Sequence, residues 1–289
     1  MAIHAKWILT TNALRFHLCR HAPSPGHPGY PLQVIDLHSH ILPGLDDGAR
    51  DIEDSIAIAR SMVEDGVTIV AATPPVRVDY PTTARAAAEA LALVRAAVAD
   101  AGIEIDIRGG GEIALDHVDS LGIEGVAAFG LGGNPKLVLV EYPYYDVPLA
   151  LARTCARLRL HGVVPVIAHP ERNQIVQRQP NHLEEVVSAG GLVQLTAASV
   201  DGRLGRNAAD CARRLLDSCL AHLIASDAHS PGLREAGLSA AADTLNDPEL
   251  ARWLTVDVPS ALLADAELPP RPPARKRQAG VLRRFGRST

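Results

Sequence analysis

The chain has 289 residues, a formal net charge of −5 at pH 7, 47% hydrophobic residues and 21% charged residues. This balance is typical of a globular protein and excludes a largely disordered chain. No apolar run reaches the roughly 18 residues that a membrane-spanning helix needs. Aromatic residues make up only 3% of the chain, and a core of small aliphatic side chains favours buried parallel strands covered by helices.

Basic charge is concentrated at the C-terminal end. Seven residues between Arg271 and Thr289 are basic and none is acidic, and subtracting their charge from −5 leaves −12 for the rest of the chain. We do not expect an acidic protein of this kind to bind nucleic acid. For the tail, a disordered, solubilising end is the simpler interpretation, and contact with an anionic membrane surface is the alternative.

The four cysteines are Cys19, Cys155, Cys211 and Cys219. They show no C-x-x-C spacing, and none has an arginine six positions later, which excludes a phosphatase loop with a cysteine nucleophile. Free thiols of this kind predict a reducing, cytoplasmic setting.

Three segments are expected along the chain. Residues 1–33 are predicted to be a disordered N-terminal extension, because APSPGHPGYP at 22–31 is typical of a flexible linker. Residues 34–262 are predicted to form the folded domain. Residues 263–289 form a Pro/Arg-rich basic tail that we also predict to be disordered.

Short apolar runs alternate with longer helical patterns. In chain order, the predicted strands cover residues 34–40, 68–73, 105–112, 137–142, 163–169, 192–196 and 223–227. The predicted helices cover residues 52–65, 83–101, 148–160, 182–189, 207–220 and 233–244. This alternation indicates an α/β fold with parallel strands, either a closed barrel or an open sheet.

Polar side chains end several of these apolar strands. They are His38, His40, Glu112, Glu141, His169, Asp227 and His229. A charged residue that ends an apolar strand is costly unless it is paired or bound to metal. The carboxyl ends of barrel strands meet on one face, whereas an open sheet would spread these residues along a line. We therefore predict a barrel-like fold with one site at its mouth.

His38 and His40 are two residues apart on the first predicted strand, so both imidazoles face the same side. Imidazoles at this spacing suit a divalent metal, but an isolated H-x-H pair is a weak signal, and the prediction depends on the whole set. Asp36, on the same face, is expected to accept supporting hydrogen bonds. Asp46-Asp47-Gly48 follows in the next loop.

Six segments carry a resemblance to a known family. They are VIDLHSHILPGLDDG, ATPP, GGEI, LVEYP, VIAHPER and IASDAH. Together they resemble the PHP (polymerase and histidinol phosphatase) superfamily. Within it they are most similar to the CpsB/CapC family, manganese-dependent bacterial protein-tyrosine phosphatases linked to capsule and exopolysaccharide synthesis. The resemblance covers about residues 34 to 260 and implies a distorted (β/α)7 TIM-like barrel, the PHP fold.

The resemblance also implies a set of metal ligands. A first ion would be held by His38, His40, Glu112 and Asp227. A second ion would be held by Glu112, as a bridge, with Glu141 and His169. A third would be held by Asp47, His229 and a histidine that the family has in an A-T-P-H motif. This chain has Pro75 at that position, so the third site is short of a ligand. Two or three divalent ions are therefore expected, and Mn2+ is the expected metal.

Two arginines match the family's phosphate-binding arginines, Arg172 in AHPER and Arg234 after SDAH. With Asp47 and His229 they form the expected catalytic set. Arg77, in the loop after the second predicted strand, is more simply a solvated side chain than a phosphate ligand.

The implied function is a metal-dependent phosphotyrosine-protein phosphatase that cleaves phosphomonoesters with a metal-activated hydroxide and regulates exopolysaccharide or capsule synthesis. The implied partner is a phosphotyrosine protein, such as the tail of a bacterial tyrosine kinase. Two alternatives stay open. One is a histidinol-phosphatase-like PHP enzyme acting on a small-molecule phosphate, and the other is a degenerate protein that binds phosphorylated ligands, which Pro75 suggests.

Overall fold

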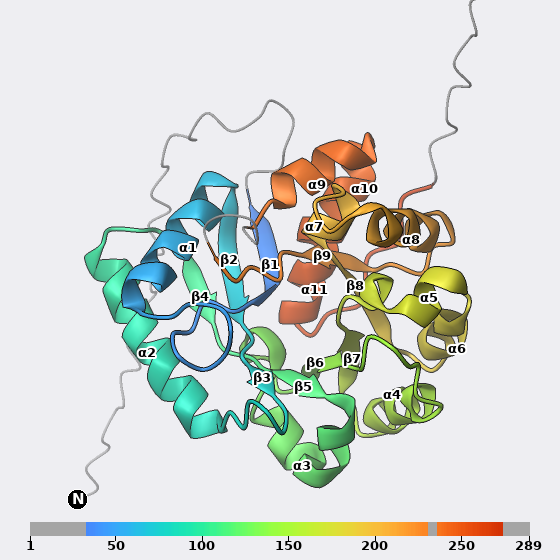
Figure 1. Cartoon of the computed structure of the whole chain (residues 1–289), viewed down its shortest axis with the longest axis horizontal. Helices are drawn as coiled ribbons and strands as arrows, with labels where there is room; N and C mark the ends of the chain where they lie inside the picture. Colours follow the sequence, from blue (N-terminus) through green and yellow to red (C-terminus); the bar gives the residue numbers. More distant parts are fainter. Residues whose placement is uncertain (1–32, 231–235, 274–289) are drawn as a thin grey trace, which may run out of the picture.

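The computed structural model of the chain describes residues 33–230 and 236–273. In these residues strands lie at the centre and helices surround them (Figure 1). The strands are β1 (Val34–Ser39), β2 (Val67–Ala72), β3 (Pro75–Val76), β4 (Asp106–Arg108), β5 (Glu112–Ala114), β6 (Leu137–Glu141), β7 (Val164–Ile167), β8 (Leu192–Thr196) and β9 (Leu223–Ala225). The helices are α1 (Ile52–Glu64), α2 (Ala84–Asp100), α3 (Leu115–Ala127), α4 (Ala150–Leu160), α5 (Gln174–Arg178), α6 (His182–Ser188), α7 (Ala197–Val200), α8 (Arg206–Asp217), α9 (Leu238–Leu245), α10 (Pro248–Arg252) and α11 (Val258–Leu263).

The strands pair in parallel, which confirms the expected α/β class. They form two sheets, one in the order β1-β2-β4 and one in the order β3-β5-β6-β7-β8-β9, and the described residues contain no closed sheet. The two sheets meet at an isolated parallel bridge between Ser39 and Ala228. There the His40 amide donates to the Ala228 carbonyl at 2.8 Å, and the Asp227 amide donates to the His38 carbonyl at 2.9 Å.

One predicted strand, residues 105–112, is divided in the structure. β4 ends at Arg108 and β5 begins at Glu112, with three glycines between them. Gly111 lies so close to Phe129 that a Cβ there would be 2.7 Å from the ring Cδ1. Glu112 therefore starts β5 instead of ending a strand, and its neighbour in the register is Pro75 of β3.

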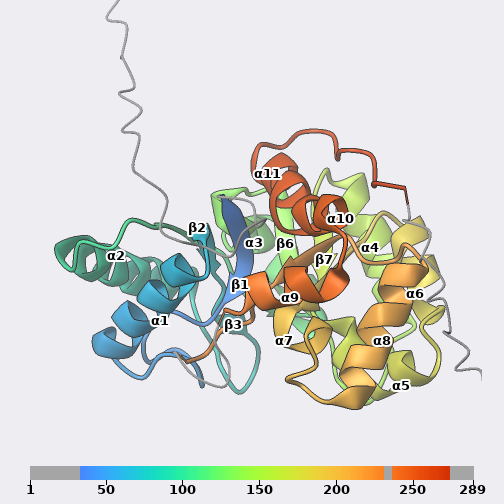
Figure 2. The ribbon, with the colours of Figure 1, turned by 90° about the horizontal axis from the view of Figure 1, so that it is seen from above.

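Helix ends and buried faces follow ordinary local rules. The Asp51 side chain accepts from the Asp54 amide at the start of α1, and Thr83 does the same for the Ala86 amide at the start of α2. On α1, Ile58 and Met62 are four residues apart and fully buried, as expected for an amphipathic helix packed on a sheet. Figure 2 shows α1 and α2 at one end of the molecule, with α5, α6 and α8 at the other.

The helix α3 was missed by the sequence analysis. Gly122 interrupts it with φ 64°, and a glycine in that conformation weakens the helical pattern of the segment. No helix among residues 33–230 and 236–273 is long and apolar enough to cross a membrane.

The first residues of the expected basic tail pack against the folded domain. The Arg271 guanidinium donates to the carbonyls of Ala221 and Leu216 and lies over the Trp253 ring, 5.1 Å from its centroid. The Trp253 indole donates to the Pro269 carbonyl at 3.0 Å. Residues 264–273 thus run along the protein, whereas the remainder of the tail lies outside the described residues.

The same region predicts a pH dependence of stability. His222 is partly buried, and its Nδ1 accepts from the Val193 amide at 3.2 Å. Burial, helped by nearby Arg271, lowers the pKa of His222 to about 4. As pH falls below the ordinary imidazole pKa of about 6.5, the unfolded chain therefore takes up this proton before the folded protein does.

His222→Asn keeps an acceptor for the Val193 amide but does not titrate. Between about pH 7 and about pH 5, we expect wild type to lose on the order of 2 kcal/mol more of its free energy of unfolding than the variant loses. Denaturant unfolding of both proteins at the two pH values measures the difference. Equal losses would contradict the assignment of a neutral, buried His222.

Candidate metal centre

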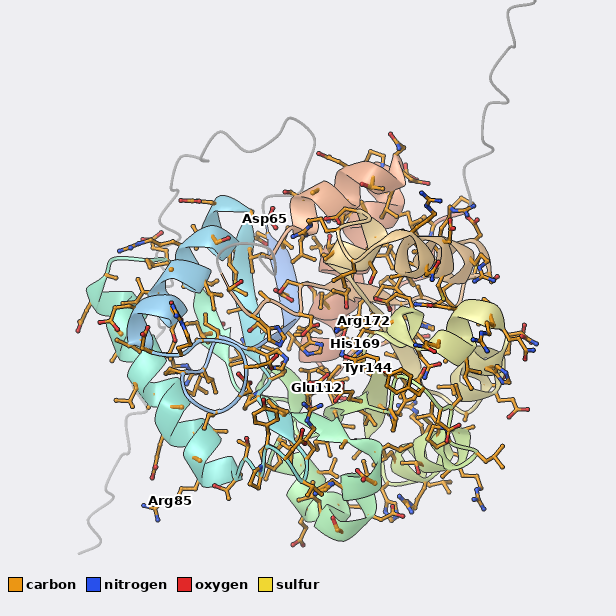
Figure 3. The ribbon with its side chains drawn as sticks, in the orientation of Figure 1. Asp65, Arg85, Glu112, Tyr144, His169 and Arg172 are labelled. Carbon is orange, nitrogen blue, oxygen red and sulfur yellow. The ribbon has the colours of Figure 1, made fainter. Side chains whose placement is uncertain are left out.

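The polar residues that the sequence analysis selected gather where the two sheets meet. Figure 3 shows Glu112, His169, Arg172 and Tyr144 close together at the centre of the molecule. β1 brings His38 and the residue after its end, His40, to one side because alternate residues of a strand share a face. Both imidazoles are buried, with exposed fractions of 0% and 3%.

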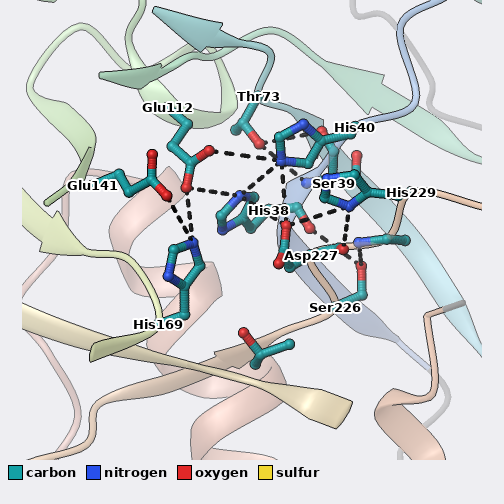
Figure 4. A network of polar contacts seen from close by, with 12 residues as sticks. His38, Ser39, His40, Thr73, Glu112, Glu141, His169, Ser226, Asp227 and His229 are labelled. Atoms are coloured by element: carbon teal, nitrogen blue, oxygen red, sulfur yellow. Dashed lines mark hydrogen bonds and ion pairs between the residues drawn. The ribbon is translucent and has the colours of Figure 1, made fainter. Parts of the chain in front are cut away.

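His38 and His40 face two carboxylates that come from distant parts of the chain (Figure 4). The Nε2 atom of His38 lies 3.4 Å from Glu112 Oε1 and 3.4 Å from Asp227 Oδ1. His40 Nε2 lies 3.2 Å from Asp227 Oδ1 and 3.3 Å from His38 Nε2. This arrangement brings together all four residues expected at the first ion.

The residues expected at the second ion also lie together. His169 Nε2 is 2.9 Å from Glu112 Oε1 and 4.0 Å from Glu141 Oε1. All three side chains are buried. Glu112 is common to both groups because its Oε1 atom faces His38 as well as His169.

In three of the histidines, Nδ1 donates a hydrogen bond to an oxygen atom. His38 Nδ1 donates to Gln194 Oε1 at 2.9 Å, and His40 Nδ1 donates to Asp46 Oδ2 at 2.8 Å. His229 Nδ1 donates to the backbone carbonyl of Asp227 at 2.8 Å. Because none of these oxygens carries a proton to give, each ring keeps a proton on Nδ1 and directs Nε2 to the centre.

Charges in the cluster are strongly coupled. Burial opposes protonation of His40, but hydrogen bonds to Asp227 and Asp46 outweigh it and raise the pKa of His40 to about 10. Burial also disfavours ionisation of Glu112, yet neighbouring His38 holds the pKa of Glu112 well below its usual range. The pKa of Asp227 is lowered in the same way, chiefly by His38 against the effect of burial. Glu112 and Asp227 therefore stay ionised, and their negative charge is balanced by the histidines around them.

This donor set fits divalent metal ions. Two ligand atoms that are each about 2.1 Å from one tetrahedrally coordinated ion lie about 3.4 Å apart, close to the 3.2–3.4 Å that separate the atoms around His38. When the Nε2 protons are lost, the imidazole lone pairs and the carboxylate oxygens face one another and can bind a cation between them. A divalent cation that accepts nitrogen and oxygen ligands fits the distances between these atoms and neutralises the carboxylates.

The expected third site is less complete. His40, Asp227 and His229 form one group of convergent ligand atoms, and Asp47 Oδ1 lies 3.5 Å from His229 Nε2. The Asp47 side chain is 57% exposed, whereas His229 is buried. Pro75 lines the same pocket but supplies no ligand atom, as the sequence indicated.

Two of the candidate ligands have a left-handed backbone, with φ 35° at His169 and φ 54° at Asp227. This conformation is disfavoured for residues other than glycine, and such strain is concentrated at functional sites. Gly48 allows another close approach, because a Cβ there would be 2.3 Å from the His40 carbonyl oxygen. The Asp46-Asp47 loop can therefore fold back onto His40.

The structure places two of the three arginines considered in the sequence, Arg172 and Arg77. Arg172 lines the pocket, donates to Asp227 Oδ2 at 2.6 Å and lies over the Tyr144 ring, 5.0 Å from its centroid. Arg234 lies outside the described residues. The expectation that Arg77 is merely solvated is wrong, since it lines the pocket and donates to Glu141 Oε2 at 3.1 Å.

Gln194 and Asp46 had no role assigned from the sequence. Gln194 is fully buried in the otherwise apolar β8, and a lone polar residue inside such a strand is a usable signal. Asp36 accepts from the amides of His38 and Ser226, at 3.2 and 2.9 Å, as expected for a supporting residue.

Most of the chain is similar in sequence to known proteins. The family described as "Capsular polysaccharide synthesis, CpsB/CapC" matches residues 34–263. Tyrosine-protein phosphatase YwqE of Bacillus subtilis is 34% identical over 201 residues, which cover 68% of this chain and 78% of that protein. Tyrosine-protein phosphatase CpsB of Streptococcus pneumoniae is 26% identical over 243 residues, which cover 80% of this chain and 99% of that protein.

A solved structure agrees with these sequence matches. It comes from work on YwqE of Bacillus subtilis and CpsB of Streptococcus pneumoniae, described as unique metal-dependent tyrosine phosphatases. The match has a TM-score of 0.76 and 31% sequence identity, and covers 83% of this chain and 100% of the other. The chain therefore belongs to the CpsB/CapC family.

Proposed function

We propose that the chain is a metal-dependent protein-tyrosine phosphatase. The observation that carries this proposal is the buried group of histidines and carboxylates that converge beside Arg172 in one pocket of about 200 Å³. Relatives described as tyrosine-protein phosphatases support the choice of phosphotyrosine over other phosphate esters. Two free, buried cysteines, Cys155 and Cys211, are compatible with a cytoplasmic location.

Two divalent ions are the proposed cofactors, and Mn2+ is the proposed metal. One would be held by His38, His40, Glu112 and Asp227. The other would be held by Glu112, Glu141 and His169. When bound, such ions polarise the phosphoryl group and lower the pKa of water at the site.

The chain's own residues would position the phosphate and manage protons. Arg172 is held by Asp227 and by the Tyr144 ring, so its remaining N–H groups can meet phosphoryl oxygens with little loss of entropy. Arg234 is the proposed second phosphate ligand. His229 and Asp47 complete the proposed catalytic set, with Nε2 and Oδ1 3.5 Å apart. An imidazolium form of His229, protonated on both nitrogens, would donate its Nε2 proton to the leaving phenolate oxygen.

The substrate would be a phosphotyrosine protein, such as the tail of a bacterial tyrosine kinase in capsule or exopolysaccharide synthesis. Membership of a family described by capsular polysaccharide synthesis supports that setting. We propose residues 34–262 as the catalytic domain, with 1–33 and 263–289 outside it. The six basic residues that follow Arg271 would favour contact with an anionic membrane surface.

We also propose that the two sheets are parts of one distorted seven-stranded barrel. β2 and β3 are two pieces of one strand position, and β4 and β5 are two pieces of the next. The bridge between Ser39 and Ala228 would then close the ring between β1 and β9. This arrangement would direct the ligands from several strand ends to one mouth.

His38→Ala tests the metal-dependent reaction. We expect kcat/KM for a phosphotyrosine peptide to fall more than about 100-fold, because a direct ligand is lost, whereas loss of an outer-shell partner typically costs 10–100-fold. Metal content, measured by mass spectrometry, should fall with it. His182→Ala is the matched control, since His182 is exposed and contacts Gln179 outside the site.

Chelation should abolish wild-type turnover, and Mn2+ should restore it. A wild-type protein inactive on phosphotyrosine peptides with each of several divalent metals would overturn the proposal. Turnover of histidinol phosphate or sugar phosphates well above that of phosphotyrosine would instead favour the small-molecule alternative.

Pro75→His tests the incomplete third site. The new imidazole would lie in the pocket that His229 and Asp47 already line, so we expect bound metal to increase towards one additional ion and kcat to rise. Pro75→Ala, which removes the ring without adding a ligand, should leave the metal content unchanged. An equal metal content in all three proteins would show that residue 75 does not limit the third site.

A further inference from the structure

A second pocket adjoins the proposed catalytic pocket and is larger, about 460 Å³ against about 200 Å³. It lies between the loop after β3, the start of α3 and the loop that joins β6 to α4. Arg77, Glu141 and Tyr144 line both pockets. A group held at the metal ligands therefore has direct access to this second pocket, which we call the side pocket.

Exposed apolar side chains collect around the side pocket. Val78, one of its lining residues, is 78% exposed. Tyr145 and Leu149, next to its lining residues Tyr144 and Pro148, are 74% and 95% exposed. Exposed large apolar residues gathered beside a concave site mark a binding surface rather than scattered surface residues.

Ion pairs hold the walls of the side pocket in place. Arg157 of α4 pairs with Asp119 of α3. Arg77 pairs with Glu141 at 3.1 Å and Asp79 at 3.0 Å, and it lies over the Tyr80 ring. The pocket is therefore formed before a ligand arrives, which reduces the entropy lost on binding.

Charge at the side pocket limits what it can bind. Asp79, Asp116 and Asp119 line it, with side chains 66%, 80% and 67% exposed. These carboxylates disfavour a second phosphate or an anionic lipid headgroup. The apolar lining, with Leu115, Pro143 and Ala150 among its members, favours an uncharged hydrophobic group.

We propose that the side pocket receives a large apolar side chain of the substrate protein, next in sequence to the phosphotyrosine or close to it. This inference rests on the proposed function, because it assumes that a phosphotyrosine lies at the metal ligands. The shared wall of Arg77, Glu141 and Tyr144 connects the two positions. The enzyme then selects substrates by an apolar residue as well as by the phosphate.

Matched phosphopeptides test the proposal with the full chain loaded with Mn2+. One peptide has glycine at every position flanking the phosphotyrosine, and the others carry leucine at each flanking position in turn. p-Nitrophenyl phosphate, which has no flanking residue, reports the reaction alone. We expect the best leucine peptide to exceed the glycine peptide about tenfold in kcat/KM, because it buries an additional apolar side chain.

A substitution that fills the side pocket tests whether the preference for leucine arises there. Ala150 is exposed at the start of α4 and lines the side pocket, and Ala150→Trp should bring the leucine-to-glycine ratio close to one. Ala96→Trp, the same change at an exposed position of α2, should keep the wild-type ratio. Circular dichroism and thermal unfolding confirm that both variants are folded.

The outcomes separate the two proposals. If the wild type cleaves neither p-nitrophenyl phosphate nor peptides, the proposed function fails. If it cleaves both but leucine and glycine peptides react equally, the side-pocket proposal is overturned and the proposed function stands. A ratio that Ala150→Trp leaves unchanged would also overturn it. So would equal peptide turnover combined with inhibition by an uncharged alkyl glycoside, which would assign the pocket to an apolar ligand that is not a peptide.

Discussion

The convergence of buried imidazole nitrogens and carboxylate oxygens is the constraint on which the rest of the structure depends. His38 belongs to the three-stranded sheet, Glu112 begins a strand of the six-stranded sheet, and Asp227 follows β9. Buried carboxylates are costly unless positive charge lies between them. The two sheets meet at this point around groups that need positive charge between them, and the candidate metal centre is also the joint between the sheets.

A second layer of contacts makes this centre rigid. Gln194 and Asp46 fix the tautomers of His38 and His40 from opposite sides, and the left-handed backbones of His169 and Asp227 direct their side chains inward. The cost of that strain is offset by the surrounding packing, since β6 and β8 are buried along their whole lengths. Preorganised ligands of this kind are what metal-assisted phosphoryl transfer requires, because catalysis there depends on positioning and charge.

The proposed catalytic pocket and the side pocket share one wall. Arg77 and Tyr144 contact proposed metal-centre residues on one side and line the apolar side pocket on the other. In this arrangement, recognition of a neighbouring side chain and placement of the phosphate are physically connected. Pro75 begins β3, two residues before Arg77, and supplies no ligand atom to the pocket that it lines.

The sequence by itself determined the α/β class, most strand positions and the membership of the ligand cluster, because apolar runs that end in His38, Glu141 or Asp227 are costly without a partner. The resemblance to the CpsB/CapC family drew attention to Pro75, because a proline, which cannot coordinate a metal, stands where that family has a histidine. Only the tertiary structure decided that Glu112 begins a strand, that Gln194 orients His38 and that Arg77 faces Glu141. The last two outcomes depend on contacts between residues 64 and 156 positions apart, and local periodicity carries no information about which distant groups will meet.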